Sequence, residues 1–259
     1  MSLVLLTNVR QYAGPGAVAS LLQDGHTVAC HDASFVDVSA RAEFQEQYPA
    51  HALEAQTPET VHAEVVARWG VPDAVVSNDV HPIVRHEIEA IPPDHFRATF
   101  EAVVMVPVRL TQLFLPHMKA LRRGAFVFVT SARETRPEPG FAVPTTLRAA
   151  TTAFAKALAK EAAPFGVQAN VVAPNYLYSE MYYPRARFID DPTGRDTIAR
   201  GAVRSSRPAG RGRRAYCVPC FREVVLHHGT SNLFRRGLAV IKALQLFREP
   251  GAMSEVGTF

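Results

Sequence analysis

The sequence has 259 residues, of which 47% are hydrophobic and 20% charged, a composition typical of a globular protein with one α/β domain. It lacks the basic and long apolar regions of a secretory signal peptide, and no run approaches the roughly 18 apolar residues of a membrane span. Three cysteines, Cys30, Cys217 and Cys220, are too few for a disulfide scaffold. We therefore expect a cytoplasmic protein that does not bind membranes.

The formal net charge of +4 is unevenly distributed along the chain. Residues 201–259 contain ten Arg or Lys and three acidic residues, whereas residues 1–200 contain 18 basic and 21 acidic residues. The basic character belongs to the tail, which contains no recognisable nucleic-acid-binding motif. We expect no nucleic-acid partner.

Apolar strand-like runs alternate with helical patterns along the first 200 residues, which indicates βαβ units and a parallel sheet. Right-handed crossovers would make this a Rossmann-like, doubly wound α/β fold, with a ligand site at the carboxyl ends of the strands. Thr57 is a candidate N-cap for the clearest of the short helices. The predicted strands are 3–6, 27–30, 51–53, 74–76, 125–129 and 168–172, and the clearest predicted helices are 58–68, 94–121 and 145–163.

The pattern degrades after about residue 200, so we predict a single domain over 1–200 and a basic, irregular segment over 201–259. Within that segment, 205–214 is rich in Arg, Gly, Pro and Ser and indicates a linker, whereas 232–247 could form a basic amphipathic helix. A shifted reading frame in a GC-rich gene would also produce such an abrupt change. The isolated Cys217-Val218-Pro219-Cys220 motif and the His227-His228 pair do not form a metal motif, and we predict no metal site.

The segment after the first predicted strand lies where a nucleotide-binding protein carries a glycine turn. Glycines there let the backbone approach a pyrophosphate. Here Asn8 and Tyr12 occupy the first two glycine positions, and only Gly14 remains. The Tyr12 phenol would fill the volume of a nicotinamide cofactor, which predicts that the protein uses no cofactor. The alternative is that Tyr12 simply covers the start of a helix.

Six short stretches together resemble the short-chain dehydrogenase/reductase superfamily and, within it, the halohydrin dehalogenases, which use the same fold without a nicotinamide cofactor. The stretches are 7–16, 26–32, 77–79, 131–133, 148–150 and 174–177. The resemblance implies a Rossmann fold and a homo-oligomer, in that family a tetramer. It also implies small-molecule partners, namely a haloalcohol or epoxide and a halide ion.

The resemblance assigns catalytic roles to Ser131 and Arg148. In the dehalogenases, Ser holds the substrate oxygen and Arg lowers the pKa of a Tyr that takes the hydroxyl proton. The alkoxide then displaces the vicinal halide and closes an epoxide. The same resemblance implies a halide pocket formed by Tyr12, Pro174, Asn175, Tyr176 and Leu177.

The tyrosine itself is missing, because Pro144 stands four residues before Arg148. A positioned base contributes roughly 10²- to 10⁴-fold in rate, so its loss predicts impaired activity. Tyr176 or Tyr178 could replace it if the loop after the sixth predicted strand reaches the site.

Each predicted site residue also has a structural interpretation. Ser131 could cap the turn after its strand, Arg148 could form an ion pair with Glu101, and Pro174-Asn175 could merely turn the chain. The clustering of Tyr176, Tyr178, Tyr182 and Tyr183 instead favours a wall that faces a ligand.

Three functional hypotheses follow. The first is a halohydrin dehalogenase-like protein whose base is lost or relocated. The second is a non-catalytic relative that binds a small ligand or anion. The third is an NAD(P)-dependent short-chain oxidoreductase.

Overall fold

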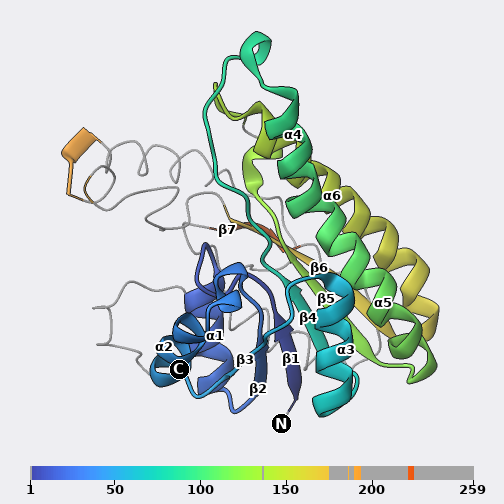
Figure 1. The fold of residues 1–259 in the computed structure, drawn as a ribbon. Coiled ribbons are helices and arrows are strands. Elements are labelled where there is room, and N and C mark those ends of the chain that lie inside the picture. Colours follow the sequence, from blue (N-terminus) through green and yellow to red (C-terminus); the bar gives the residue numbers. More distant parts are fainter. Residues whose placement is uncertain (1, 136, 175–185, 187–189, 194–220, 225–259) are drawn as a thin grey trace, which may run out of the picture.

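The computed structural model describes residues 2–135, 137–174, 186, 190–193 and 221–224. Its centre is a seven-stranded sheet with the order β3-β2-β1-β4-β5-β6-β7, flanked by helices on both faces (Figure 1). The first six strands pair in parallel, and β7 pairs with β6 in antiparallel orientation. The predicted Rossmann-like α/β fold is confirmed.

The element bounds follow the sequence pattern closely. Most predicted strands agree with the structure to within two residues at each end. The strands are β1 (Leu3–Leu6), β2 (Thr27–Cys30), β3 (His51–Ala52), β4 (Ala74–Ser77), β5 (Gly124–Val129), β6 (Val167–Pro174) and β7 (Phe221–Val224). The helices are α1 (Gly14–Gln23), α2 (Val38–Gln47), α3 (Pro58–Trp69), α4 (Pro93–Phe100), α5 (Val106–Ala120) and α6 (Ala142–Ala162).

Three details differ from the sequence-based expectation or refine it. The single helix predicted over 94–121 is α4 and α5 joined by a π-helical turn, η3 (Glu101–Met105). Helix α6 begins three residues earlier than predicted. Strand β7 lies inside the segment that the sequence predicted to be irregular, whereas the predicted linker 205–214 and helix 232–247 lie outside the described residues.

Thr57 caps α3 as predicted. Its side chain accepts a hydrogen bond from the Thr60 backbone amide at 3.3 Å, and the Thr60 hydroxyl accepts one from the Thr57 amide at 3.0 Å. This reciprocal capping box satisfies two of the amides that a helix start leaves unpaired.

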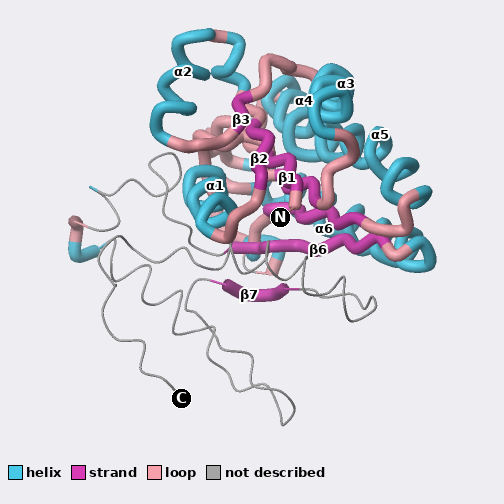
Figure 2. The backbone as a smooth tube through the Cα atoms, turned by 90° about the horizontal axis from the view of Figure 1, so that it is seen from below, coloured by secondary structure: helices cyan, strands magenta, loops and turns pink. Residues whose placement is uncertain are grey.

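The core lies on both faces of the sheet because successive side chains of a strand point to opposite faces. Val4 and Leu6 of β1 belong to the cluster covered by α1 and α2, whereas Leu5 belongs to the cluster covered by α3, α5 and α6. Figure 2 shows α1 and α2 on one side of β1–β3 and α3 and α5 on the other. All six residues of β5 are buried, as expected for the centre of a parallel sheet.

Among the described residues, Pro93–Ala120 is the one helical stretch long and apolar enough to cross a membrane, and 39% of its apolar 18-residue window is buried. Its α5 portion packs Leu110, Phe114 and Met118 into the sheet core. A core helix of a globular domain has these same properties.

The strand order places a topological switch point between β1 and β4. The chain adds β2 and β3 on one side of β1 and then returns to add β4, β5 and β6 on the other. In such sheets the loops at the carboxyl ends of the two central strands diverge and leave room for a ligand. The loops after β1, β2, β4 and β5 therefore define the candidate site.

Candidate functional site

The loop after β1 is held in an unusual shape by Asn78, which follows β4. Asn8 and Tyr12 adopt positive φ angles of 48° and 52°, a region that side-chain-bearing residues occupy at a cost of about 1–2 kcal/mol each. The Asn78 side-chain amide donates to the carbonyls of Asn8 and Gln11, both at 2.9 Å. Its oxygen accepts from the Ala13 amide at 3.2 Å. These three hydrogen bonds offset the strain of the loop.

Gly14 is retained for a packing reason. A Cβ atom at this position would lie 2.5 Å from the carbonyl oxygens of both Asn8 and Val9. The start of α1 can therefore lie this close to the loop only if residue 14 is glycine, and this holds whether or not a cofactor binds.

Tyr12 spans the crevice from the β1 loop to the end of β5. Its hydroxyl donates to the carbonyl of Thr130 at 3.1 Å. Its ring centroid lies 5.5 Å from the guanidinium carbon of Arg148, within the range of a cation–π contact. The side chain thus crosses the space through which a dinucleotide would have to pass between loop and strand.

Asp32, after β2, occupies the place where Rossmann proteins that bind NAD use an acidic residue to hold the ribose. Here one carboxylate oxygen accepts from the Arg10 amide at 3.0 Å. The other accepts from the Ser34 amide at 3.0 Å and the Ser34 hydroxyl at 2.7 Å. The carboxylate thus accepts three hydrogen bonds within the protein, two from its own turn and one from the β1 loop.

Ser131 directly follows β5. Its hydroxyl oxygen accepts a hydrogen bond from the Arg133 amide at 3.2 Å and caps the short 3-10 turn η4 (Ala132–Glu134). The capping role considered from the sequence is therefore present. Among the described residues nothing accepts the Ser131 hydroxyl hydrogen, so this half-buried group can still donate to a substrate oxygen.

Arg148 lies on the buried side of α6 and is only 7% exposed. One guanidinium nitrogen donates to the Val129 carbonyl at 2.7 Å, which holds the cation beside the end of β5. It contacts this carbonyl and the Tyr12 ring, and its charge acts on Asp79. Glu101, the ion-pair partner considered from the sequence, is exposed on η3.

Asp79 is, like Asp32, a buried acid of the site and is only 2% exposed. Burial raises its pKa, and this effect is opposed by a hydrogen bond from the Ser77 hydroxyl and by the positive charges of His31 and Arg148. Asn8 donates to its other oxygen at 2.9 Å. Asp79 therefore connects the β1 loop electrostatically to Arg148.

His31 is buried after β2, one strand away from β1. Burial lowers its pKa, whereas the nearby carboxylates of Asp79 and Asp32 and the backbone of Gln56 favour its protonated form. Within the described part of the chain, neither ring nitrogen makes a hydrogen bond of ordinary geometry. An imidazole buried in this way is a candidate for a functional group.

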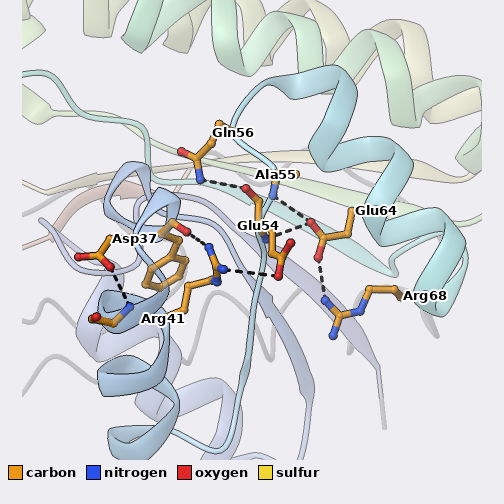
Figure 3. Close-up of polar contacts among 9 residues, drawn as sticks. Asp37, Arg41, Glu54, Ala55, Gln56, Glu64 and Arg68 are labelled. Atoms are coloured by element: carbon orange, nitrogen blue, oxygen red, sulfur yellow. Dashed lines mark hydrogen bonds and ion pairs between the residues drawn. The ribbon is translucent and has the colours of Figure 1, made fainter.

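Figure 3 shows how the chain at residues 54–56 is held. Glu64 of α3 accepts from the backbone amides of Glu54 and Ala55 at 3.1 and 3.0 Å, and Arg68 donates to Glu64 at 2.7 Å. Arg41 of α2 reaches Glu54 at 3.4 Å. These contacts anchor the segment that leads to Gln56, so the backbone facing His31 has a defined position.

Pro144 is the third residue of α6 and is half-buried. Because it lies in the first turn of the helix, its missing amide costs no intrahelical hydrogen bond. It also supplies no ionisable group near Arg148.

The predicted halide pocket is only partly described. Pro174 ends β6 and pairs with Phe221 of β7, but Asn175, Tyr176 and Leu177 lie outside the described residues, as does Tyr178. Tyr12 is therefore the member of this pocket that the structure brings to Arg148. The role of the remaining loop stays a prediction.

The sequence alone gave Asp79 and His31 no role, although His31 directly follows β2 and Asp79 lies two residues after β4, the two strands that flank β1. A charged or titratable residue at that position was the available signal. Within the described ranges, no group of three or more His, Cys, Asp or Glu side chains is arranged to hold a metal ion.

Comparisons with known proteins bear on this geometry. The profile of the family described as short chain dehydrogenase matches residues 3–188. A solved halohydrin dehalogenase bound to ethyl (2S)-oxiran-2-ylacetate is 30% identical, with a TM-score of 0.73, and the match covers 76% of this chain and 80% of that one. A second structure, described as a dehalogenation enzyme, is 34% identical with a TM-score of 0.71, covering 78% and 82%.

Curated proteins give a different kind of match. L-fucose dehydrogenase of Bos taurus is 25% identical over 224 residues, covering 80% of this chain and 76% of that protein. The sequence is thus similar both to dehydrogenases and to dehalogenases, so the chemistry of the site must distinguish between them.

Proposed function

This chain belongs to the short-chain dehydrogenase family, and from that premise we propose that it is a halohydrin dehalogenase-like protein that works without a nicotinamide cofactor. Its reaction is the conversion of a vicinal haloalcohol to an epoxide and a halide ion. Its partners are these small molecules and, by resemblance, further copies of the chain.

The observation that carries the proposal is the position of Tyr12. Its side chain crosses from the β1 loop to the Thr130 carbonyl and places its ring beside the Arg148 guanidinium. A dehydrogenase needs this passage for its cofactor, whereas a dehalogenase needs only a small cavity for a halide. The solved dehalogenation enzymes, at 30% and 34% identity, support the same choice.

Ser131 and Arg148 supply the binding chemistry in this proposal. The Ser131 hydroxyl donates to the substrate oxygen, and the Arg148 cation stabilises the negative charge that grows on that oxygen. The O–H bond breaks and its proton passes to solvent water, the oxygen electron pair forms the new C–O bond, and the carbon–halogen bond breaks as the halide leaves. Aromatic and backbone groups such as those around Tyr12 suit a large, weakly hydrated anion.

A second candidate follows from Pro144. Because this residue cannot take a proton, the chain could be a non-catalytic relative that binds a haloalcohol, an epoxide or an anion in the same pocket. The third hypothesis, an NAD(P)-dependent oxidoreductase, is supported by the curated L-fucose dehydrogenases but must accommodate Tyr12 and Asp32 as they stand.

The test is an assay of halide release from chlorinated and brominated vicinal alcohols, accompanied by calorimetric titration with NADH and NADPH. Halide release without added coenzyme supports the proposal. A thermal shift with haloalcohol or halide but no turnover would favour the non-catalytic relative. Tight coenzyme binding with alcohol oxidation would refute both.

A further inference from the structure

We propose that Arg85 and Arg133, which stack on the ring of Phe141 at the start of α6, bind a carboxylate carried by the substrate. The substrates are then haloalcohols, and the epoxides made from them, that bear an acidic group several bonds away from the reacting carbon. This inference rests on the proposed function and names its substrate class.

Phe141 lies on the same side of α6 as the proposed reaction centre. It is the N-cap residue of α6, three residues before Pro144 and seven before Arg148. Residues with this spacing share one face of a helix, and a rise of about 1.5 Å per residue puts Phe141 about 10 Å from Arg148 along the axis. Arg133, which contacts the Phe141 ring, follows Ser131 by two residues. The ring and its cations therefore adjoin the groups that hold the substrate hydroxyl.

Two guanidinium groups lie against the Phe141 ring. The guanidinium carbon of Arg133 is 3.8 Å from the ring centroid, and that of Arg85 is 4.3 Å from it. These distances add to about 8 Å, which is the largest separation that the two cations can have. A guanidinium stacked on a ring keeps its N–H donors in its own plane, where they can bind both oxygens of a carboxylate.

The loop after β4 carries Arg85 and is fixed to the loop before α6. The His86 amide donates to the Gly140 carbonyl at 3.3 Å. Gly140 has a φ of +79°, and a Cβ atom there would lie 3.3 Å from the Cβ of Arg85. This close packing holds the stem of Arg85 beside the residue that precedes Phe141. The cation therefore has little conformational freedom to lose when a ligand binds.

The positive charge around Phe141 exceeds that of its acidic partner. Arg133 is 6% exposed and pairs with Glu138 at 3.6 Å. Arg85 is exposed, and within the described part of the chain its guanidinium makes no hydrogen bond or ion pair. The first turn of α6 contains no acidic residue. Since two cations near one ring repel each other, a purely structural role would favour an uncharged side chain at Arg85, whereas a bound carboxylate offsets the repulsion.

The two ends of the substrate are recognised separately in this arrangement. Its hydroxyl lies at Ser131 and Arg148, and its carboxylate binds Arg85 and Arg133. No bond changes at the carboxylate, so this contact contributes to binding and orientation rather than to the chemical step. Because helix side chains tilt toward the N-terminus, Arg148 shortens the gap of about 10 Å, and a spacer of a few methylene groups joins the two ends.

The test compares ligands that differ in charge but not in shape. The substrates are 6-chloro-5-hydroxyhexanoate and its primary amide, and the unreactive analogues for calorimetry are 5-hydroxyhexanoate and 5-hydroxyhexanamide. In the natural chain we expect the acid to exceed the amide about 10- to 100-fold in affinity and in kcat/KM, the contribution of a hydrogen-bonded ion pair. Arg85→Gln should lower this acid-to-amide ratio about tenfold. A ratio near one in the natural chain, an unchanged ratio in Arg85→Gln, or no detectable binding of the acid would overturn the inference.

Arg97→Gln is the matched control, because Arg97 is also an exposed arginine but pairs with Asp94 of α4 at 2.8 Å. It should leave the acid-to-amide ratio unchanged. Arg85→Glu should make the amide the better ligand, since the new charge repels the carboxylate. Thermal unfolding verifies that each variant is folded.

The two ligand pairs also separate this inference from the proposed function. Halide release from both chlorinated substrates at equal kcat/KM would retain the proposed function and reject the carboxylate site. A preference for the acid in calorimetry, lost in Arg85→Gln, with no halide release from either substrate would reject the proposed function and retain the carboxylate site.

Discussion

The carboxyl edge of the sheet is constructed differently on its two sides. Over β1 and β2, Asn78 pairs with the loop carbonyls, and Asp32 accepts from the Arg10 amide of the β1 loop and the Ser34 amide of its own turn. Over β5 and the start of α6, the Ser131 hydrogen has no acceptor among the described residues, and Pro144 stands where the resemblance requires a base. In the first region the loop carbonyls and the Asp32 carboxylate are paired within the protein, whereas the second retains a hydroxyl hydrogen that a ligand can accept.

Under the proposed function, this contrast would close a coenzyme site without changing the fold. One loop with two positive-φ residues delivers a tyrosine across the crevice, and an asparagine from the neighbouring strand stabilises the loop. The same tyrosine lies beside Arg148, to which the resemblance assigns a catalytic role. The conformation of the β1 loop therefore also determines which side chain lies beside Arg148 at the end of β5.

We expect the largest effect from Pro144→Tyr, which tests the region over β5 and the start of α6. A tyrosine on the first turn of α6, one helical turn before Arg148, would restore a positioned base, and we expect halide release to rise about 10²- to 10⁴-fold. The measurement is kcat for halide release from a brominated vicinal alcohol. No gain would mean that the region lacks more than its base, while Pro144→Phe controls for aromatic bulk.

Arg148→Met should lower halide release by about 10²- to 10³-fold, the usual cost of removing one stabilising donor from an active site. It also leaves the Val129 carbonyl without its 2.7 Å partner. Arg123→Met is the control, since Arg123 lies at the opposite edge of the sheet beside Asp73, 3.7 Å away. Equal losses in both variants, measured as kcat/KM in the Pro144→Tyr background, would contradict a specific role.

Substitutions in the region over β1 and β2 should change mainly the stability of the protein. Asn78→Ala removes the partners of Asn8, Gln11 and Ala13 and should lower the free energy of unfolding by about 2–3 kcal/mol. Urea denaturation measures this change. Gln56→Ala, which deletes an exposed hydrogen bond of 3.2 Å, should change it by less than about 0.5 kcal/mol. Similar values for the two variants would show that the loop holds its shape without Asn78.

The smallest effect lies away from both regions, at His62. Burial and the neighbouring His117 lower its pKa below the ordinary value of 6.5. The unfolded chain therefore binds the proton first, so stability is full above about pH 6.5 and declines as the pH falls below it. We expect a decrease in Tm on the order of a degree between about pH 7 and 5.5 that His62→Gln reduces. An identical pH dependence in the two proteins would refute the assignment.

Much of the fold could be predicted because local patterns agree with it. The alternation of strands and helices predicted where β1 to β6 lie along the chain, and Thr57 marked the start of α3. The π-helical turn Glu101–Met105 could not be predicted, since its sequence continues the helical pattern on either side. Strand β7 could not be predicted either, because its pairing depends on β6 rather than on its own composition.

The sequence by itself determined which chemical groups are present: side chains at two glycine positions, a serine and an arginine at a reductase-like spacing, and no ionisable group at Pro144. Only the tertiary structure decided how they meet. It joined Asn8 to Asp79 across 71 positions and Tyr12 to Thr130 across 118, and it enclosed His31 beside two carboxylates. Such contacts depend on which strands become neighbours, and strand pairing is a property of the whole sheet rather than of any local pattern.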